Sequence, residues 1–178
     1  MSEKLALFSI IILLASGCIT KEDDMEKISI STEGFKDGGT IPDIYTCKGK
    51  DISPSLSWKG IPAQTKSIAL IMDDPDAPGG TFVHWVLYNV PAGTQKLPEG
   101  MPHDKILADG SMQSMTDFGR TGYGGPCPPP GKPHRYYFKI YALDSKITLA
   151  PGASKKQLEN AMTGHILAKG ELMGTYKR

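Results

Sequence analysis

Four hydrogen-bonding side chains stand at the ends of apolar, strand-like runs of the chain. Asp74 is the second residue after "SIALIM", and His84 lies at the start of "VHWVLYNV". His134 and Tyr136 open the run "HRYYFKIYAL". A buried carboxylate without partners costs several kcal/mol, so Asp74 needs donors, and imidazole and phenol groups can supply them. Such a set could bind an anion, act as an acid–base or nucleophilic pair with Cys127, or ligate a metal.

The sequence favours binding over catalysis and over metal ligation. The chain contains no G-x-S-x-G turn and no H-E-x-x-H pair, which would mark a serine hydrolase or a zinc protease. His84, His134 and Asp74 do not follow a recognisable ligand spacing. Each of them, taken alone, also fits a satisfied structural polar group. We therefore expect neither an enzyme nor a cofactor; a hydrolase and a metal site are the alternatives.

The elements that must position these groups are short strands. Because side chains alternate across a strand, residues two apart share a face. His134 and Tyr136 then extend an apolar row that continues with Phe138, Ile140 and Ala142. Asp74 ends a row made of Ile68, Leu70 and Met72. The same alternation groups His84 with Val86, Tyr88 and Val90.

The wider pattern predicts a β-rich domain with one late helix. From residue 28 onward the signals are mostly short strands separated by glycine- and proline-containing turns, and residues 101–125 are expected to form a long ordered loop. Ser154 and Gln157 have the spacing of a capping box, followed by an apolar face of Leu158, Ala161, Met162 and His165. The segment 170–178 is typical of a closing strand. Strands followed by one helix favour a β-sandwich-like fold.

Composition limits the classes of partner. The chain has 178 residues, which is most simply one domain with a real hydrophobic core. Charged residues make up 22% of it and the formal net charge is +1, so no strong field points to a nucleic acid or an anionic surface. We expect no nucleic-acid partner.

The N-terminus resembles an export signal of the lipoprotein type. Residues 5–15, "LALFSIIILLA", have the length of a signal-peptide apolar region and are too short to span a bilayer. "ASGC" places Cys18 where a lipoprotein carries its lipid. We expect a signal peptide (1–17), a polar tether (18–27) and a domain (28–178), with the protein outside the cytoplasm and attached to the membrane through lipid only. A buried N-terminal strand or an uncleaved anchor is the alternative.

Two further cysteines lie in turn-rich segments, "YTCKGK" and "GPCPPP". After export Cys47 and Cys127 would face an oxidising compartment, where disulfides persist. We therefore expect a Cys47–Cys127 disulfide, with two free thiols near the site as the alternative.

Several motifs carry a family resemblance. "DPDAP" (74–78), "VHWVLYN" (83–89) and "GPCPPPGKPHRYYFKIYAL" (125–143) resemble the phosphatidylethanolamine-binding protein family. The match is to its compact bacterial and archaeal branch, often called Raf kinase inhibitor-like proteins. "DISPSLSWKGIPAQTKSIALI" and "GHILAKGELMGTY" fit the same branch. The resemblance covers residues 28–178.

The resemblance implies a Greek-key β-fold with a small, non-catalytic pocket for phosphate or a phosphoryl head group such as phosphoethanolamine. Phe82 stands where relatives often have tryptophan, and Gly125 would let the backbone approach the ligand. Asp74 would orient an imidazole or meet the ammonium of an ethanolamine head group. The residues carried over as ligand-binding are Asp74, Pro78, Phe82, His84, Gly125, Pro126, His134 and Tyr136.

Some relatives in the family are reported as inhibitors, which gives the runner-up hypothesis. On that hypothesis the chain would inhibit a protease or a kinase through a protein interface. The expected position outside the cytoplasm favours a protease as the partner.

Overall fold

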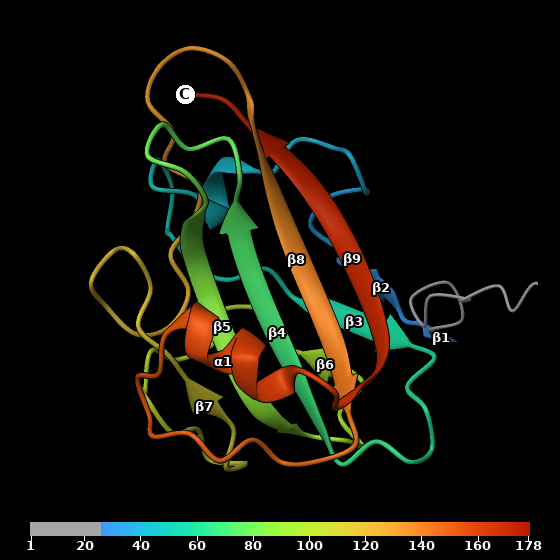
Figure 1. Ribbon diagram of the computed structural model, residues 1–178. Coiled ribbons are helices and arrows are strands. Elements are labelled where there is room, and N and C mark those ends of the chain that lie inside the picture. Colours follow the sequence, from blue (N-terminus) through green and yellow to red (C-terminus); the bar gives the residue numbers. More distant parts are fainter. Residues whose placement is uncertain (1–25) are drawn as a thin grey trace, which may run out of the picture.

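The computed structural model describes residues 26–178 as two β-sheets and one α-helix (Figure 1). The elements are β1 (Glu26–Lys27), β2 (Ser29–Ser31), the 3-10 helix η1 (Asp43–Tyr45), β3 (Leu56–Lys59), β4 (Ser67–Asp74), β5 (Phe82–Pro91), β6 (Lys96–Leu97), β7 (Met112–Gln113), β8 (His134–Leu143), α1 (Lys155–Met162) and β9 (Ile166–Tyr176). The large sheet has the strand order β1-β9-β8-β4-β5-β7, and the small sheet has the order β2-β3-β6. The expected mostly β fold with a late helix is confirmed.

The main core lies between the two sheets. The inward rows of β4 and β8 bury residues such as Met72 and Phe138, and the small sheet contributes Leu56 and Trp58. All of these side chains are nearly inaccessible to solvent. The alternation expected for β4 and β8 is therefore confirmed, because the predicted apolar rows face the same core.

Helix α1 covers part of the other face of the large sheet (Figure 1). Leu158 and Met162 pack against a second apolar cluster that includes Ile71 and Val86. The helix begins as predicted: the side chain of Ser154 accepts from the Gln157 backbone N–H, and Gln157 closes the capping box. A capping box satisfies two otherwise unpaired backbone donors, which fixes where the helix starts.

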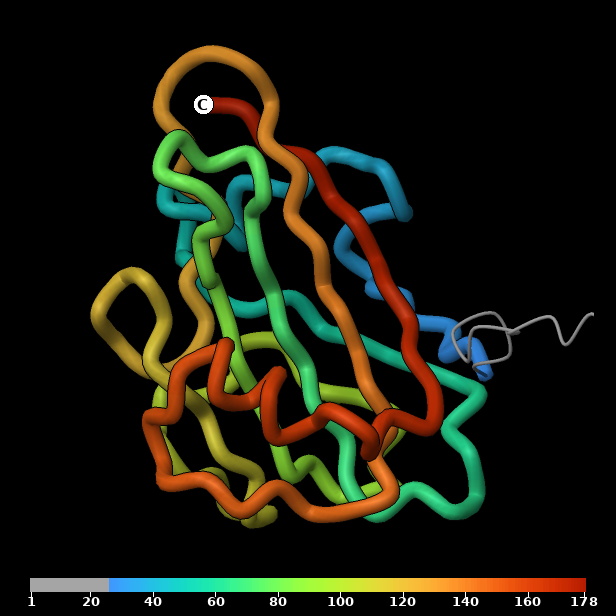
Figure 2. Tube along the Cα trace, viewed as in Figure 1, coloured from blue at the N-terminus to red at the C-terminus, as the bar shows by residue number. Residues whose placement is uncertain are grey.

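One end of the large sheet gathers the segments that carry the polar motifs. The turn between β4 and β5, the loop before β8 and the C-terminus all lie at this end (Figure 2). Strand pairing sets the positions: Asp74 is opposite Phe82, and His134 is opposite Tyr176. Segments distant in sequence therefore meet at one edge of the fold.

Two expectations about the chain's segments need revision. Glu26 and Lys27, placed in the polar tether, instead form β1 because their backbone pairs in parallel with Ala168 and Lys169 of β9. The long loop 101–125 is ordered as expected, but it also contains β7, which pairs with β5. The expected signal peptide, Cys18 and the rest of the tether lie outside the described residues. Between residues 26 and 178 there is no helix long and apolar enough to span a membrane.

Candidate functional site

A pocket of about 190 Å³ opens at the end of the sheet where the polar motifs meet. Its polar groups are deep: the exposed fractions of Asp74, His84 and His134 are 3%, 3% and 8%. Its rim is more exposed and apolar. The lining residues are Asp74, Ala77, Pro78, Phe82, His84, Phe118, Cys127, Pro128, Pro129, His134 and Tyr136. Six of the eight residues expected to bind ligand are thus brought together.

His134 is held by a direct bond to a carboxylate. Its Nδ1–H donates to Oδ2 of Asp74 at 2.8 Å, and both side chains are buried. The other Asp74 oxygen accepts from the Asp76 backbone N–H at 2.8 Å. A carboxylate fixed in this way sets the orientation and tautomer of the imidazole. Among the described residues the Nε2 atom of His134 has no partner, and His134 lines the pocket.

His84 reaches the pocket through a β-bulge, so its expected alignment was wrong. Met72 pairs with Trp85 whereas Asp73 pairs with Val83, which makes His84 the extra residue of β5. A bulge disrupts alternation and redirects the side chain. The His84 ring therefore packs on Tyr136, with ring centroids 5.2 Å apart. Alternation had grouped His84 with Val86 and Tyr88, but these two face the cluster under α1 and His84 does not.

The His84 ring is neutral in the free protein near pH 7. Its Nδ1–H donates to the carbonyl oxygen of Gly124 at 2.7 Å. Burial lowers its pKa below the usual 6.5, and the bond to Gly124 and nearby carboxylates oppose this effect more weakly. Nε2 is therefore an unprotonated acceptor until a ligand or a proton reaches it.

Tyr136 contributes a hydroxyl that the fold leaves without a well-formed hydrogen bond. Its side chain is fully buried, and within residues 26–178 no partner of good geometry accepts from or donates to the hydroxyl oxygen; Asp74 lies close enough for a weak interaction only. Burial, together with the charge of Asp74 and the weak hydrogen bond to it, raises the pKa of this phenol well above 10. The group therefore stays protonated and can donate to a ligand.

Phe118 is a pocket residue that the sequence analysis missed. Its ring packs edge-on against Phe82 and His84, with centroids 4.8 Å and 5.2 Å away. The Arg120 guanidinium carbon lies 5.6 Å from the centroid of the same ring. Phe118 belongs to an irregular turn, where no periodic signal marks which side chain points inward. Ala77, Cys127, Pro128 and Pro129 were also not expected to line the pocket.

Gly125 and Pro126 lie behind the pocket wall and do not line it. The backbone N–H of Gly125 is already engaged, because it donates to Oδ1 of Asp51 at 2.6 Å. A Cβ at Gly125 would collide with the Tyr45 carbonyl oxygen, so glycine is needed for close packing rather than for ligand access. Beside this junction, Cys47 and Cys127 form a disulfide.

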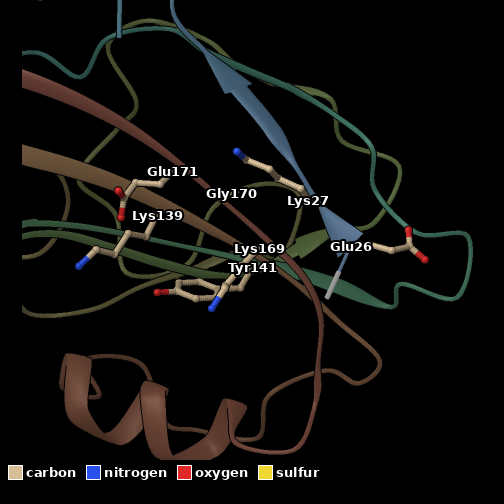
Figure 3. A pocket seen from close by; sticks show the side chains of 7 residues that line it. All are labelled: Glu26, Lys27, Lys139, Tyr141, Lys169, Gly170 and Glu171. Atoms are coloured by element: carbon tan, nitrogen blue, oxygen red, sulfur yellow. The ribbon is translucent and has the colours of Figure 1, made fainter. Parts of the chain in front are cut away.

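A larger hollow of about 470 Å³ lies elsewhere, along β1, β8 and β9 (Figure 3). It is lined by Glu26, Lys27, Lys139, Tyr141, Lys169, Gly170 and Glu171, so its charges are mixed. Lys139 is already paired with Asp73 at 2.9 Å. Buried polar groups without partners are absent from its lining, which makes it the weaker candidate. Across residues 26–178, no cluster of three or more His, Cys, Asp or Glu side chains is placed to hold a metal ion.

Comparison with known proteins places this pocket in a family. The phosphatidylethanolamine-binding protein family model matches residues 31–177. The chain belongs to the phosphatidylethanolamine-binding protein family. The matched region contains every residue that lines the pocket.

Relatives in the family support this assignment along most of the chain. A protein of Methanothermobacter thermautotrophicus described as UPF0098 is 50% identical over 151 residues, which cover 85% of this chain and 99% of the relative. An Aquifex aeolicus protein with the same description is 51% identical and covers 85% and 89%. The crystal structure of Escherichia coli YbcL, described as a member of the mammalian PEBP family, matches with a TM-score of 0.80 and 34% identity, covering 85% and 99%. Chlamydia trachomatis CT736 matches with a TM-score of 0.78 and 39% identity, covering 85% and 98%.

Proposed function

We propose that this protein is a non-catalytic binding protein whose pocket takes a small phosphate-type anion, either inorganic phosphate or a phosphoryl head group such as phosphoethanolamine. One observation carries the proposal. In the described part of the chain the buried Tyr136 hydroxyl makes no well-formed hydrogen bond, only a weak interaction with Asp74, and it lines the same pocket as two histidines whose Nδ1 atoms are already bonded. Buried polar groups are normally satisfied, so an unpaired one calls for an explanation, and a bound ligand supplies it.

The size of the pocket fits a small ligand. A volume of about 190 Å³ is well under the roughly 300–1,000 Å³ typical of sites for drug-sized molecules. The deep end offers one phenol and two imidazoles, and the rim offers Phe82 and Phe118. A phosphoryl group in the deep end would accept from these donors, while a short substituent would contact the apolar rim.

The charge of the pocket implies that binding takes up a proton. No lysine or arginine is found among the residues that line it, whereas Asp74 is a carboxylate. His84 is neutral when the pocket is empty, because burial lowers its pKa. An anion beside Nε2 favours the protonated imidazole. Binding should therefore strengthen as pH falls toward and below about 6.5 and weaken above it.

Calorimetric titration tests this proposal. Phosphate, phosphoethanolamine and sulfate are titrated into the protein from about pH 5.5 to 8, in buffers of different ionisation enthalpy. Sulfate keeps its charge over this range, so a proton taken up with sulfate must reside on the protein. We expect saturable binding of all three anions, with proton uptake.

His134→Ala should weaken phosphate binding roughly ten- to a hundredfold, since a charge-assisted hydrogen bond contributes about 1.5–3 kcal/mol. His165→Ala is the matched control. His165 also bonds to an aspartate, Asp144 at 2.8 Å, but this pair is exposed and is not part of the pocket. If the wild type binds none of the three anions at millimolar concentration, the proposal is wrong. The remaining hypothesis is then an inhibitor of a protease or kinase, tested by pull-down with secreted proteases.

We also propose that Cys18 is lipidated and holds the domain outside the cytoplasm. The motif "ASGC" after a short apolar run supports this, and so does the disulfide, because such bonds persist in oxidising compartments. Intact mass of the membrane-extracted protein should give a chain that begins at a lipid-modified Cys18. A soluble product that retains Met1 would contradict it.

A further inference from the structure

Both pocket histidines are held at Nδ1, but by different means. His134 donates directly to the Asp74 carboxylate. His84 donates to the carbonyl of Gly124, and the N–H of the same peptide group, which belongs to Gly125, donates to Asp51. Each imidazole is therefore linked to a carboxylate: His134 directly to Asp74, and His84 to Asp51 through the Gly124–Gly125 peptide group.

Asp51 is held in an unusual backbone conformation. Its φ is +55°, in the left-handed region that non-glycine residues seldom adopt. Its side chain is 30% exposed, and its two oxygens have different partners: Oδ1 accepts from Gly125 and Oδ2 from Arg120, both at 2.6 Å. Backbone strain of this kind persists only where the surroundings enforce it, and it is concentrated at functional sites.

We propose that Asp51 is a positioning residue of the pocket, which acts through the Gly124–Gly125 peptide group to fix the Nδ1–H form of His84 and so present Nε2 to the ligand. A carboxylate that accepts from a peptide N–H polarises that peptide and makes its carbonyl a stronger acceptor. The stronger acceptor holds the imidazole proton on Nδ1. Partners of this kind set the tautomer and the orientation of a functional histidine.

The surroundings of His84 agree with this role. The carboxylates that act on it are Asp74, Asp117 and Asp51, and all three favour its protonated form, against burial. Phe82, Phe118 and Tyr136 pack around the ring and bring no charge. Of the three carboxylates, Asp51 is the one linked to the ring through a continuous hydrogen-bonded path by way of Gly124 and Gly125.

If the role of Asp51 were purely structural, it would act through its other carboxylate oxygen, Oδ2. Oδ2 of Asp51 holds Arg120, whose guanidinium lies over Phe118 at the pocket rim. If Asp51 only ties the loops together, then loss of Arg120 should disturb His84 as much as loss of Asp51. If the peptide group transmits the effect, Arg120→Ala should leave the His84 tautomer unchanged.

Nuclear magnetic resonance of the ring nitrogens of the ligand-free protein separates these roles. The wild type should contain neutral His84 with the proton on Nδ1. Asp51→Ala should produce a mixture of tautomers and lower the pKa of His84. Asp51→Asn, whose amide oxygen can still accept from Gly125, should keep the tautomer and lower only the pKa. Arg120→Ala and the remote control Glu33→Gln, at an exposed ion pair with Lys96, should keep the tautomer.

A second measurement links the tautomer to binding, and this part rests on the proposed function. The phosphate affinity should fall about three- to tenfold in Asp51→Ala and by a smaller factor in Asp51→Asn. It should be unchanged in Glu33→Gln. An unchanged His84 tautomer in Asp51→Ala, or an equal change in Arg120→Ala, overturns the positioning role. Wild-type protein that shows the Nδ1–H tautomer but binds none of phosphate, phosphoethanolamine and sulfate overturns the proposed function and leaves the positioning of His84 standing.

Discussion

The hydroxyl of Tyr136 makes no well-formed hydrogen bond within residues 26–178, although its side chain is fully buried; its interaction with Asp74 is weak. Leaving such a group unpaired costs about 1–3 kcal/mol, so the empty pocket is less stable than an apolar one of the same shape. The two neighbouring imidazoles avoid this cost because Gly124 and Asp74 accept their Nδ1 protons. The Tyr136 hydroxyl lines the pocket, so a ligand bound there can accept its hydrogen bond.

Tyr136→Phe should separate binding from stability. Removal of an unpaired buried hydroxyl should leave the free energy of unfolding unchanged or raise it by up to about 1 kcal/mol. The same change should weaken phosphate binding about three- to tenfold, because one neutral hydrogen bond contributes roughly 0.5–1.5 kcal/mol. Urea unfolding and calorimetric titration of the same preparation measure both effects. A clear loss of stability with unchanged affinity would mean that the hydroxyl serves the fold.

His84 should make the empty protein less stable in mild acid. Its pKa is near 6.5 in the unfolded chain and lower in the folded protein, because burial disfavours the charged ring. The stabilising difference is therefore fully present above pH 6.5 and is lost as pH falls below it toward the folded pKa. The free energy of unfolding, measured with urea from about pH 7.5 to 5, should fall less steeply in His84→Gln than in the wild type. Identical slopes would contradict a buried, neutral His84.

At the scale of elements, the sequence was informative wherever a side chain's direction followed from regular geometry. Strand alternation predicted the rows that place Asp74, His134 and Tyr136, and the spacing of Ser154 and Gln157 predicted the start of α1. Alternation gave the wrong direction for His84, because the bulge depends on how β4 and β5 pair. The sequence alone does not show which strands pair or in which register.

Loop residues could not be assigned from the sequence for a related reason. Phe118 and Asp51 lie in irregular segments, where neither the two-residue nor the 3.6-residue period applies. Asp51 is placed by contacts with Arg120 and Gly125, and Phe118 by contacts with Phe82 and His84, all of which form only when segments distant in sequence meet. The motif resemblance identified pocket residues within the quoted motifs but gave no reason to single out these two.

Helix α1 is attached to the sheet by a buried charge. The Asp73 side chain is inaccessible to solvent and bonds Lys139 of β8 at 2.9 Å and Lys155, the first residue of α1, at 2.6 Å. Removing one partner of a buried ion pair leaves an incompletely compensated charge. The second lysine limits that penalty here.

Lys155→Met should therefore lower the free energy of unfolding by about 1–2 kcal/mol, less than the loss expected for an isolated buried pair. Its neighbour supplies the control: Lys156 is exposed, and Lys156→Met should change stability by less than about 0.5 kcal/mol. Urea unfolding of both variants measures the difference. Equal stabilities would mean that apolar packing alone holds α1 on the sheet.

At the scale of the whole molecule, the pocket depends on a junction between two loops. Four hydrogen bonds join them: Tyr123 to the Tyr45 carbonyl, Cys47 to the Pro126 carbonyl, and both Gly125 and Arg120 to Asp51. The disulfide lies at the end of this junction. Beyond it, residues 128–133 make no backbone–backbone hydrogen bond in the part of the chain that the structure describes. The pocket wall is thus held by Cys127 on one side and by β8 on the other.

Replacing both cysteines, Cys47→Ser with Cys127→Ser, should affect the fold and the pocket to different degrees. The bond joins residues 80 apart in sequence, so chain-entropy arguments give a loss of about 4 kcal/mol in the free energy of unfolding, reduced by any strain relieved. The four hydrogen bonds of the junction remain, so the variant should still fold, but the freed wall should weaken phosphate binding several-fold. Urea unfolding and calorimetric titration test both effects. Reduction of the wild type should reproduce the variant, while the reductant should leave the variant itself unchanged. A variant as stable as the oxidised wild type would show that the bond adds nothing to the fold, and an unchanged phosphate affinity would show that Pro128 and Pro129 keep their place without it.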